Sequence, residues 1–555
     1  MKKMKKIKYM FMLLPFALGV QAQTKVEGEA TVGAGYGETT PYMGGMNLKV
    51  NTGKFTIMPY LNIYGITHYN SNELTSMELT YTRSGNFYTQ EQEKKWKGYQ
   101  LGYGTDIQFR LNDRNIFQAS IDGVHSDRRF TGERGEYMFD KNGALLSSVK
   151  SFLSSPTLYR DEVNVQTSYL HKTKLKGETL LLKYNYSLDN DDDNRLQYLT
   201  ETAGFSPDMY TLNLITSDIF IHKHEVLFDW KRPITKGQLL NVGAKYINNF
   251  IHSYDGQWLD DFEFNNSEFR HRTQTGGIYA AYSLKTKAIE ADARVEYDYT
   301  RMQEKNLHDV IPLALFAYHI NSHNTLTASY AMRVIRPTLQ YLNDNKVKGP
   351  YTLEYGNKNL EGTHVNRMAL AYALKTKKVD FTTTVSHINV TDGFNAIWMD
   401  VENIRVYTWG NEGVRKAIEI TPEVLWRAAE RTKLKAAFTA LWDERIAYPI
   451  DLFNPNWGFT GRAGLEQELP FDIQLNLSAM VSKGNTVDVY SHEGLSYTFG
   501  GNLERSFLND KLIAALGYEY KKIPFIEITQ GAYTGSIYTR HHNPNTVKVA
   551  LTYKF

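Results

Sequence analysis

The sequence predicts an all-β fold: a closed antiparallel transmembrane β-barrel of about 22 strands. Three observations predict it. Hydrophobic residues alternate with polar ones over long stretches, short turns alternate with long polar segments, and the chain ends on an alternating strand. Tyrosine and phenylalanine are abundant, with 38 and 27 copies, and cysteine is absent. Stability must therefore come from hydrogen bonding and packing, without disulfides or thiolate metal sites.

The alternation is clearest in residues 288–300, and it recurs in 99–111 and 511–521. In 288–300, one face carries apolar and aromatic side chains, while the other carries a charge at every step from Glu290 to Asp298. Strands of soluble sandwiches are typically about five or six residues long. A tilted transmembrane strand needs about 9 to 11 residues, with apolar side chains toward lipid and polar ones toward the lumen. Because lipid cannot satisfy an open sheet edge, the sheet must close.

Short turns predict ten hairpins, which face the periplasm in an outer-membrane barrel. Strands at 25–37 and 545–555 complete an even number, with both termini periplasmic. The predicted short turns are 51–54, 112–115, 174–177, 231–237, 285–287, 321–324, 375–378, 429–432, 469–472 and 508–510. The predicted long extracellular loops are 69–97, 131–160, 190–217, 253–269, 337–361, 396–413 and 522–544.

The first 22 residues resemble a cleaved signal peptide, with five lysines, a short apolar core and the cleavage motif Val20-Gln21-Ala22. We therefore expect residues 23–555 to form a single barrel domain, exported to the outer membrane of a Gram-negative cell. The five leader lysines exceed the net charge of +3 of the whole chain. The remainder is thus slightly acidic, and nothing indicates nucleic-acid binding.

The last strand is expected to close the barrel by pairing with the strand near 25–37. Its alternate residues should face lipid, with the terminal aromatic at the periplasmic interface. Outer-membrane lipid is the partner that this strand predicts. The lipid-facing residues are Val547, Val549, Leu551, Tyr553 and Phe555.

Residues 310–374 resemble the barrel of TonB-dependent receptors and the related outer-membrane β-barrel family common in Bacteroidota. The match is best over roughly 300–555, and the ending Tyr553-Lys554-Phe555 is similar too. The resemblance implies that the last strand is the assembly signal, which the barrel assembly machinery recognises. The sequence departs at Lys358, where the family has Pro, at Asp344 after the Leu-Asn pair, and at 361–363. The residues that carry the resemblance are Arg336, Pro337, Leu342, Asn343, Gly356, Asn357 and Leu360.

The resemblance implies nutrient or small-molecule transport, but strand-like sequence begins at about residue 25 and leaves no room for the family's plug domain. We therefore expect transport to require a partner, either a surface lipoprotein or a plug-bearing receptor. A non-transporting scaffold or adhesin that displays its loops is an alternative, and a simple porin is a third. Porins typically have about 16 to 18 strands.

Nothing in the sequence indicates an enzyme or a cofactor, since serine-elbow, HExxH, Walker and GxGxxG motifs do not occur. The acidic run 189–194 has the spacing of a calcium loop but lacks its glycine and its last glutamate, and a solvated loop is the alternative. His222 and His224 share a strand face and could hold a metal, or they could be a lumenal or interfacial pair without a metal. Aromatic residues of the long segments could stack on a sugar, haem or another planar ligand, or dock a surface partner. Alternatively, they sit in the outer girdle or pack loop on loop. They include Trp258, Trp398, Trp409 and Trp457.

Overall fold

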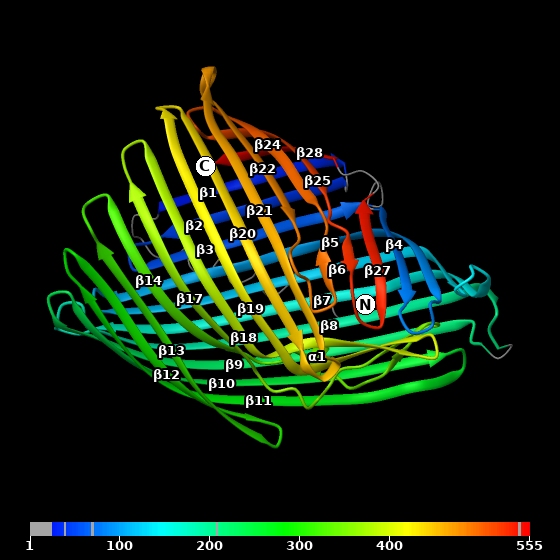
Figure 1. Ribbon diagram of the computed structural model, residues 1–555. Coiled ribbons are helices and arrows are strands. Elements are labelled where there is room, and N and C mark those ends of the chain that lie inside the picture. Colours follow the sequence, from blue (N-terminus) through cyan, green and yellow to red (C-terminus); the bar gives the residue numbers. More distant parts are fainter. Residues whose placement is uncertain (1–24, 38–39, 68–71, 207–208, 542–544) are drawn as a thin grey trace.

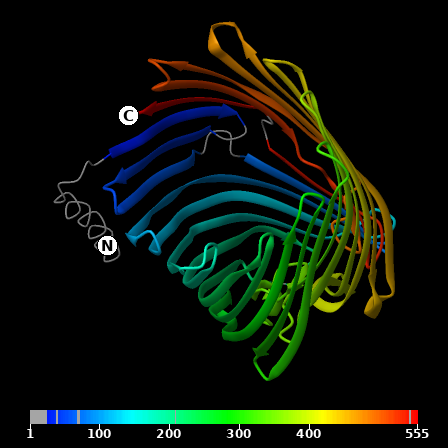
Figure 2. The same ribbon diagram turned by 90° about the vertical axis from the view of Figure 1, so that its left-hand side faces the viewer.

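A computed structural model describes residues 25–37, 40–67, 72–206, 209–541 and 545–555. The predicted signal peptide lies outside these residues. The described chain forms one sheet of 28 strands, and 22 of them close into an antiparallel ring (Figures 1 and 2). The predicted fold class and strand number are therefore confirmed. Among the described residues, no helix is long and apolar enough to span a bilayer.

The ring strands follow chain order except where short strands of the outer segments intervene. They are β1 (Lys25–Gly37), β2 (Thr40–Asn51), β3 (Phe55–Thr67), β5 (Phe87–Asn112), β6 (Asn115–Phe139), β7 (Leu145–Lys172), β8 (Thr179–Ala203), β9 (Leu212–Thr235), β10 (Gln238–Leu259), β11 (Phe262–Lys285), β12 (Ile289–Met302), β13 (Lys305–His319), β14 (Asn324–Ile335), β17 (Thr363–Lys375), β18 (Val379–Val401), β19 (Ile404–Ala429), β20 (Thr432–Ala447), β21 (Leu452–Leu469), β22 (Ile473–Lys483), β24 (Ser496–Phe507), β25 (Leu512–Lys522) and β28 (Asn545–Lys554).

Six short strands lie outside the ring. Four of them extend the ring at its outer end, because β4 pairs with β5 and β27, and β26 joins β27 to β23. The other two form a small hairpin that pairs with β19 in parallel. They are β4 (Asn72–Tyr81), β15 (Val347–Lys348), β16 (Thr352–Glu354), β23 (Ser491–Glu493), β26 (Ile526–Ile528) and β27 (Tyr533–His541). In the part of the chain that the structure describes, the helical segments are α1 (Leu339–Leu342) and two 3₁₀ turns, Tyr448–Ile450 and Pro470–Asp472.

One end of the ring carries only short connections, and all ten predicted short turns are found there. Polar side chains fix several of them. Asn321 Oδ1, for example, accepts hydrogen bonds from the backbone N–H groups of His323 and Asn324 at 2.8 and 2.9 Å. We take this end as periplasmic, as short turns are in outer-membrane barrels.

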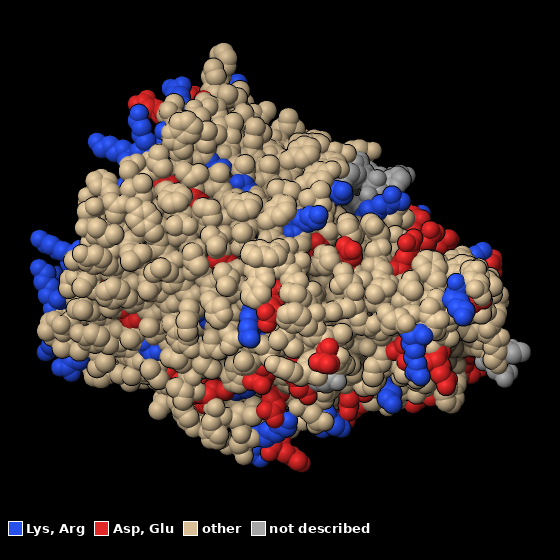
Figure 3. All heavy atoms as spheres, viewed as in Figure 1, with Lys and Arg blue, Asp and Glu red and all other residues tan. Residues whose placement is uncertain are grey.

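The two faces of the wall differ in polarity as the alternation predicts. On β12, Val295, Tyr297 and Tyr299 are 55, 41 and 40% exposed on the outer face. Glu296 and Asp298 point inward and are 7% exposed. Figure 3 shows a broad uncharged surface between a basic edge at the short turns and a mixed charged region at the other end. This surface has the character of a lipid-facing band.

Most of the predicted long loops are strand, which corrects that part of the prediction. β7 has 28 residues and β5 has 26, far more than a bilayer needs. The predicted loop 131–160 shrinks to a connection at 140–144, and 396–413 is the end of the β18–β19 hairpin. Residues 337–361 remain largely outside strands. Beyond the membrane a strand needs no apolar face, so these segments resemble loops in the sequence.

The ring closes where β28 pairs with both β25 and β1. The hydroxyls of Thr31 and Thr552 are 2.9 Å apart across this seam, on the lumenal face. On the outer face, the predicted lipid-facing residues of β28 are 41 to 52% exposed. The last strand therefore occupies the closing position, while its role in assembly stays a prediction.

Candidate functional site at the extracellular end

The extracellular end of the ring holds a buried cluster of aromatic and aliphatic side chains. Tyr81, Tyr88 and Tyr490 are fully buried, and Tyr533 is 1% exposed. The cluster joins residues of β4 to β8 with residues of β18, β20 and β21 and of the 489–537 region. These two groups of strands lie on opposite sides of the ring. Their inward side chains therefore meet across the mouth of the barrel.

The tip of the β18–β19 hairpin makes the polar contacts across the mouth. The Tyr81 hydroxyl donates to the Asn403 carbonyl at 3.3 Å, and the Asn86 amide donates to Asn403 Oδ1 at 3.0 Å. The Tyr533 hydroxyl donates to the Met399 carbonyl at 2.5 Å. We call residues Met399–Arg405 the bridging hairpin.

Arg405 is the charged centre of the bridging hairpin. It is 3% exposed, and its guanidinium lies 3.9 Å from the Tyr88 ring centroid. Nη2 donates to the Tyr88 hydroxyl at 3.1 Å, and that hydroxyl donates to the buried Glu136 carboxylate at 2.7 Å. Burial raises the pKa of Tyr88 well above its usual value, so the phenol stays protonated and can bridge the two charges.

This network keeps unused hydrogen-bonding capacity. Glu136 Oε2 and Arg405 Nε are buried and have no hydrogen-bond partner among the described residues. Buried polar atoms are nearly always paired in folded proteins. The Arg405–Tyr88–Glu136 network therefore has the capacity to form other hydrogen bonds.

The loop that joins β22 to β23 closes the same end from another side. Arg445 donates to the carbonyls of Thr486 and Val487 at 2.9 and 2.8 Å, and Asp443, 1% exposed, pairs with Arg445 and Arg415. The Tyr490 hydroxyl accepts a hydrogen bond from the Trp398 backbone N–H at 3.0 Å. The loop is thus tied both to the wall and to the bridging hairpin's strand.

The residues that carried the family resemblance come together in the segment between β14 and β17. Leu342 and Leu360 are buried beside Phe269. The Gly356 N–H donates to the Asn343 carbonyl at 2.6 Å, and the Asn357 side chain donates to the Trp409 carbonyl at 2.9 Å. A Cβ on Gly356 would lie 2.4 Å from that Asn343 oxygen, so only glycine fits. The motif therefore folds this segment, with Pro337 buried at its start.

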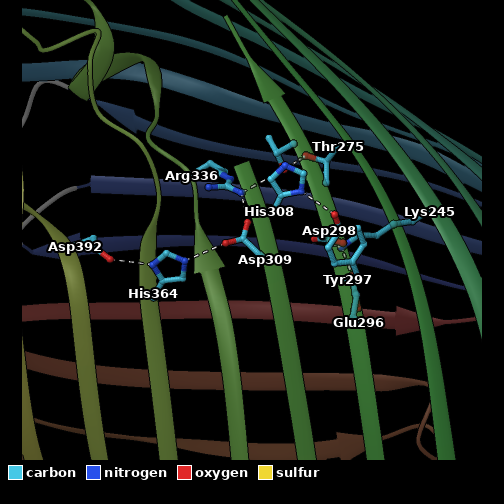
Figure 4. A network of polar contacts seen from close by, with 11 residues as sticks. Lys245, Thr275, Glu296, Tyr297, Asp298, His308, Asp309, Arg336, His364 and Asp392 are labelled. Carbon is cyan, nitrogen blue, oxygen red and sulfur yellow. Dashed lines mark hydrogen bonds and ion pairs between the residues drawn. The ribbon is translucent and has the colours of Figure 1, made fainter. Parts of the chain in front are cut away.

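Arg336, the first residue of the motif, anchors the segment to the barrel wall (Figure 4). Its guanidinium pairs with Asp309, which is 5% exposed, and donates to the Thr300 hydroxyl at 3.3 Å. His364 lies between Asp309 and Asp392, with nitrogen–oxygen distances of 3.0 and 3.1 Å. Lys245 on β10 pairs with Glu296 and Asp298, which both lie on β12. The lumenal wall from β10 to β18 is thus polar and ion-paired.

The four predicted tryptophans do not form one platform. Trp398 stacks on Tyr490, with ring centroids 4.3 Å apart, and Trp409 packs on Tyr341 at 4.4 Å. Trp258 is half-buried in β10, and Trp457 is 71% exposed on β21. For Trp398 and Trp409 the packing alternative fits, and ligand contact by any of the four stays a prediction.

The histidines considered as metal ligands have tyrosine partners instead. His222 Nδ1 lies 3.0 Å from the Tyr186 hydroxyl, and His224 Nδ1 lies 2.9 Å from that of Tyr184. Over the described part of the chain, no group of three or more potential ligands could hold a metal. The acidic run lies in β8, where Asp189 pairs with Arg160 at 2.8 Å.

Sequence reasoning missed that the His222 and His224 pairs belong to a series on the outer face. Tyr99 with His125 and Tyr297 with His308 repeat the arrangement, at 3.3 and 2.7 Å. Tyr and His share an apolar ring and a polar tip, which suits a membrane interface. To predict these Tyr–His pairs, one must know the register between neighbouring strands, which the sequence alone does not provide.

Comparisons with known proteins agree with the barrel fold. A family model described as "Outer membrane protein beta-barrel family" matches residues 171–553, more than half of the chain. No curated protein matches the sequence. The ferric enterobactin receptor of Pseudomonas aeruginosa is similar in structure, with a TM-score of 0.61 and 13% identity over 97% of this chain and 82% of that one.

Two further solved structures are similar to the same degree. The siderophore receptor PirA from Pseudomonas aeruginosa has a TM-score of 0.61 and 10% identity, over 97% of this chain and 81% of that one. The copper transporter OprC has a TM-score of 0.63 and 10% identity, over 96% and 81%. At such identities the likeness shows a shared fold.

Proposed function

Because the chain belongs to the outer membrane protein beta-barrel family, we propose that it is a gated transport barrel of the outer membrane. In this proposal it moves a nutrient or another small molecule together with a partner protein. The partner is a surface lipoprotein that contacts the outer segments or a plug-bearing receptor. The similar structures include a siderophore receptor, a ferric enterobactin receptor and a copper transporter, which supports transport as the kind of activity.

The observation that carries the proposal is the bridging hairpin. Arg405 reaches the opposite side of the ring and meets Tyr88 and, through it, Glu136. A permanently open porin needs a clear path through its mouth, and contacts across the mouth close that path. A gated barrel does, since the bridge excludes solutes until a ligand or partner supplies other hydrogen bonds for the same buried groups.

Conductance of the purified full-length protein in planar bilayers tests the proposal. We expect the wild type to pass little current and Arg405→Ala to conduct in long openings. Arg427→Ala is the matched control, because this arginine pairs with Asp380 near the short turns, far from the mouth. If both variants and the wild type stay silent and insensitive to solutes, transport is contradicted.

A non-transporting scaffold is the alternative, and the outer sheet of β4, β27, β26 and β23 favours it as a surface for display. Crosslinking in membranes discriminates between the two functions. A stable partner bound at the outer segments, combined with a silent Arg405→Ala barrel, would support the scaffold.

A further inference from the structure

The lipid-facing wall contains an apolar groove of about 780 Å³ that crosses β11 to β19. Its floor is set by strand register, because Ala293 on β12 pairs with Ala314 on β13. In the same row, Tyr282 flanks Ala293 and Tyr330 flanks Ala314. Two methyl groups between two phenol rings leave a depression in a wall that is otherwise covered by larger side chains.

Apolar side chains also form the groove's far side. Met368 and Leu370 of β17 are 55 and 51% exposed, and both line the groove. All of these residues belong to the outward row, which faces the hydrocarbon of the bilayer. An extended hydrocarbon chain is therefore the ligand that fits the groove.

The groove lies close to the short turns, in the periplasmic half of the wall. Ala293 is four residues from the start of β12, and the turn before this strand carries Lys287. The turn between β17 and β18 carries Lys377 and Lys378. These three lysines are exposed, and no ion pair is recorded for them among the described residues.

Acidic groups do not neutralise this edge. Glu290 pairs with Lys285 and lies 3.6 Å from His319, and Asp380 pairs with Arg427 at 2.6 Å. In Figure 3, lysine and arginine atoms gather at the edge beside the uncharged surface, with few acidic atoms among them. Exposed ammonium groups therefore lie along the edge of the barrel wall next to the periplasmic end of the apolar groove.

We propose that this groove and the lysines at the adjoining turns form a binding site for one anionic phospholipid of the periplasmic leaflet. An acyl chain lies over Ala293 and Ala314, and the anionic headgroup lies at the basic edge formed by the turns that carry Lys287, Lys377 and Lys378. Basic pockets beside apolar surface hold anionic lipid headgroups by this combination of forces. The site is on the outer wall, so it is separate from any path through the lumen.

Native mass spectrometry of the full-length protein tests the proposal. The protein is reconstituted with equal amounts of phosphatidylglycerol and phosphatidylethanolamine and then released into detergent. We expect one phosphatidylglycerol to be retained preferentially. Ala293→Phe fills the groove and should abolish retention. Lys287→Gln, Lys377→Gln and Lys378→Gln should each weaken the preference for phosphatidylglycerol about fivefold, as expected for one cation near anionic headgroups.

Ala244→Phe is the matched control, because Ala244 is an exposed alanine on β10 outside the groove. It should retain lipid like the wild type, and both Phe variants should run as folded, heat-modifiable barrels. Equal retention of the two lipids would overturn the proposal. So would retention by Ala293→Phe at the wild-type level, since ordinary solvating lipid would then account for the binding.

Discussion

Gly28 and Phe555 exchange two backbone hydrogen bonds, at 3.0 and 2.9 Å, across the seam of the barrel. A Cβ on Gly28 would lie 2.8 Å from Cζ of the Phe555 ring. The terminal residue is thus hydrogen-bonded to the first strand, and a glycine makes room for its ring. The last residue of the chain completes the ladder between β1 and β28.

Deleting Phe555 should therefore lower the amount of folded barrel more than it alters any binding. The deletion removes both hydrogen bonds to Gly28 and an aromatic group at the interface, where such groups anchor barrels. Heat-modifiable mobility in membrane fractions measures the folded amount. Lys554→Gln, which leaves the backbone pairing intact, is the control. Normal membrane levels of the truncated protein would contradict the prediction.

How far the sequence predicts this fold depends on the solvent around each segment. Where a strand crosses the membrane, one face must be apolar, so the alternation of β12 and β28 reveals both strand and orientation. The tight turns can be predicted from the sequence equally well. Prediction from alternation fails around Asp189, where β8 continues beyond the membrane. Both faces of the strand are polar there, so the segment resembles a loop in the sequence.

The candidate site could be predicted only in part. Gly356 and Asn357 were identified through a family resemblance, and their contacts explain why the motif needs those residue types. Arg405, Tyr88 and Glu136 carry no local signal, because they lie 317 and 48 residues apart in sequence. Only the closure of the ring brings them together.

Tyr88→Phe should loosen the mouth without unfolding the barrel. The substitution removes the hydroxyl that bridges Arg405 and Glu136, and leaving buried charged groups short of a partner costs about 1–3 kcal/mol. We expect faster proteolysis of the bridging hairpin, measured by time-resolved digestion and peptide mapping. Tyr297→Phe removes a hydroxyl on the outer face and should leave the rate unchanged. Equal rates for both variants would show that the bridge does not hold the hairpin.

Gly356→Ala should displace the segment between β14 and β17. The new Cβ would meet the carbonyl oxygens of Asn343 and Tyr341 at 2.4 and 2.7 Å, so the backbone must shift. Overpacking of this kind typically costs about 1–3 kcal/mol. Thermal unfolding and hydrogen exchange of residues 336–363 measure the effect. Gly102→Ala, where a Cβ would meet nothing within 4 Å, is the control and should change neither.

Alkaline pH should open the mouth before it unfolds the ring. Burial raises the pKa of Tyr351 and of Tyr490 from 10.0 to about 12. Because these pKa values are higher in the folded state, their contribution to stability is complete below pH 10 and is lost as pH rises to about 12. Trp398, stacked on Tyr490, reports the change through its fluorescence. Tyr490→Phe removes the ionisable hydroxyl of one of these two tyrosines. The loss of packing over this pH range should therefore be smaller in the variant. An unchanged fluorescence titration in that variant would place the pH-sensitive group elsewhere.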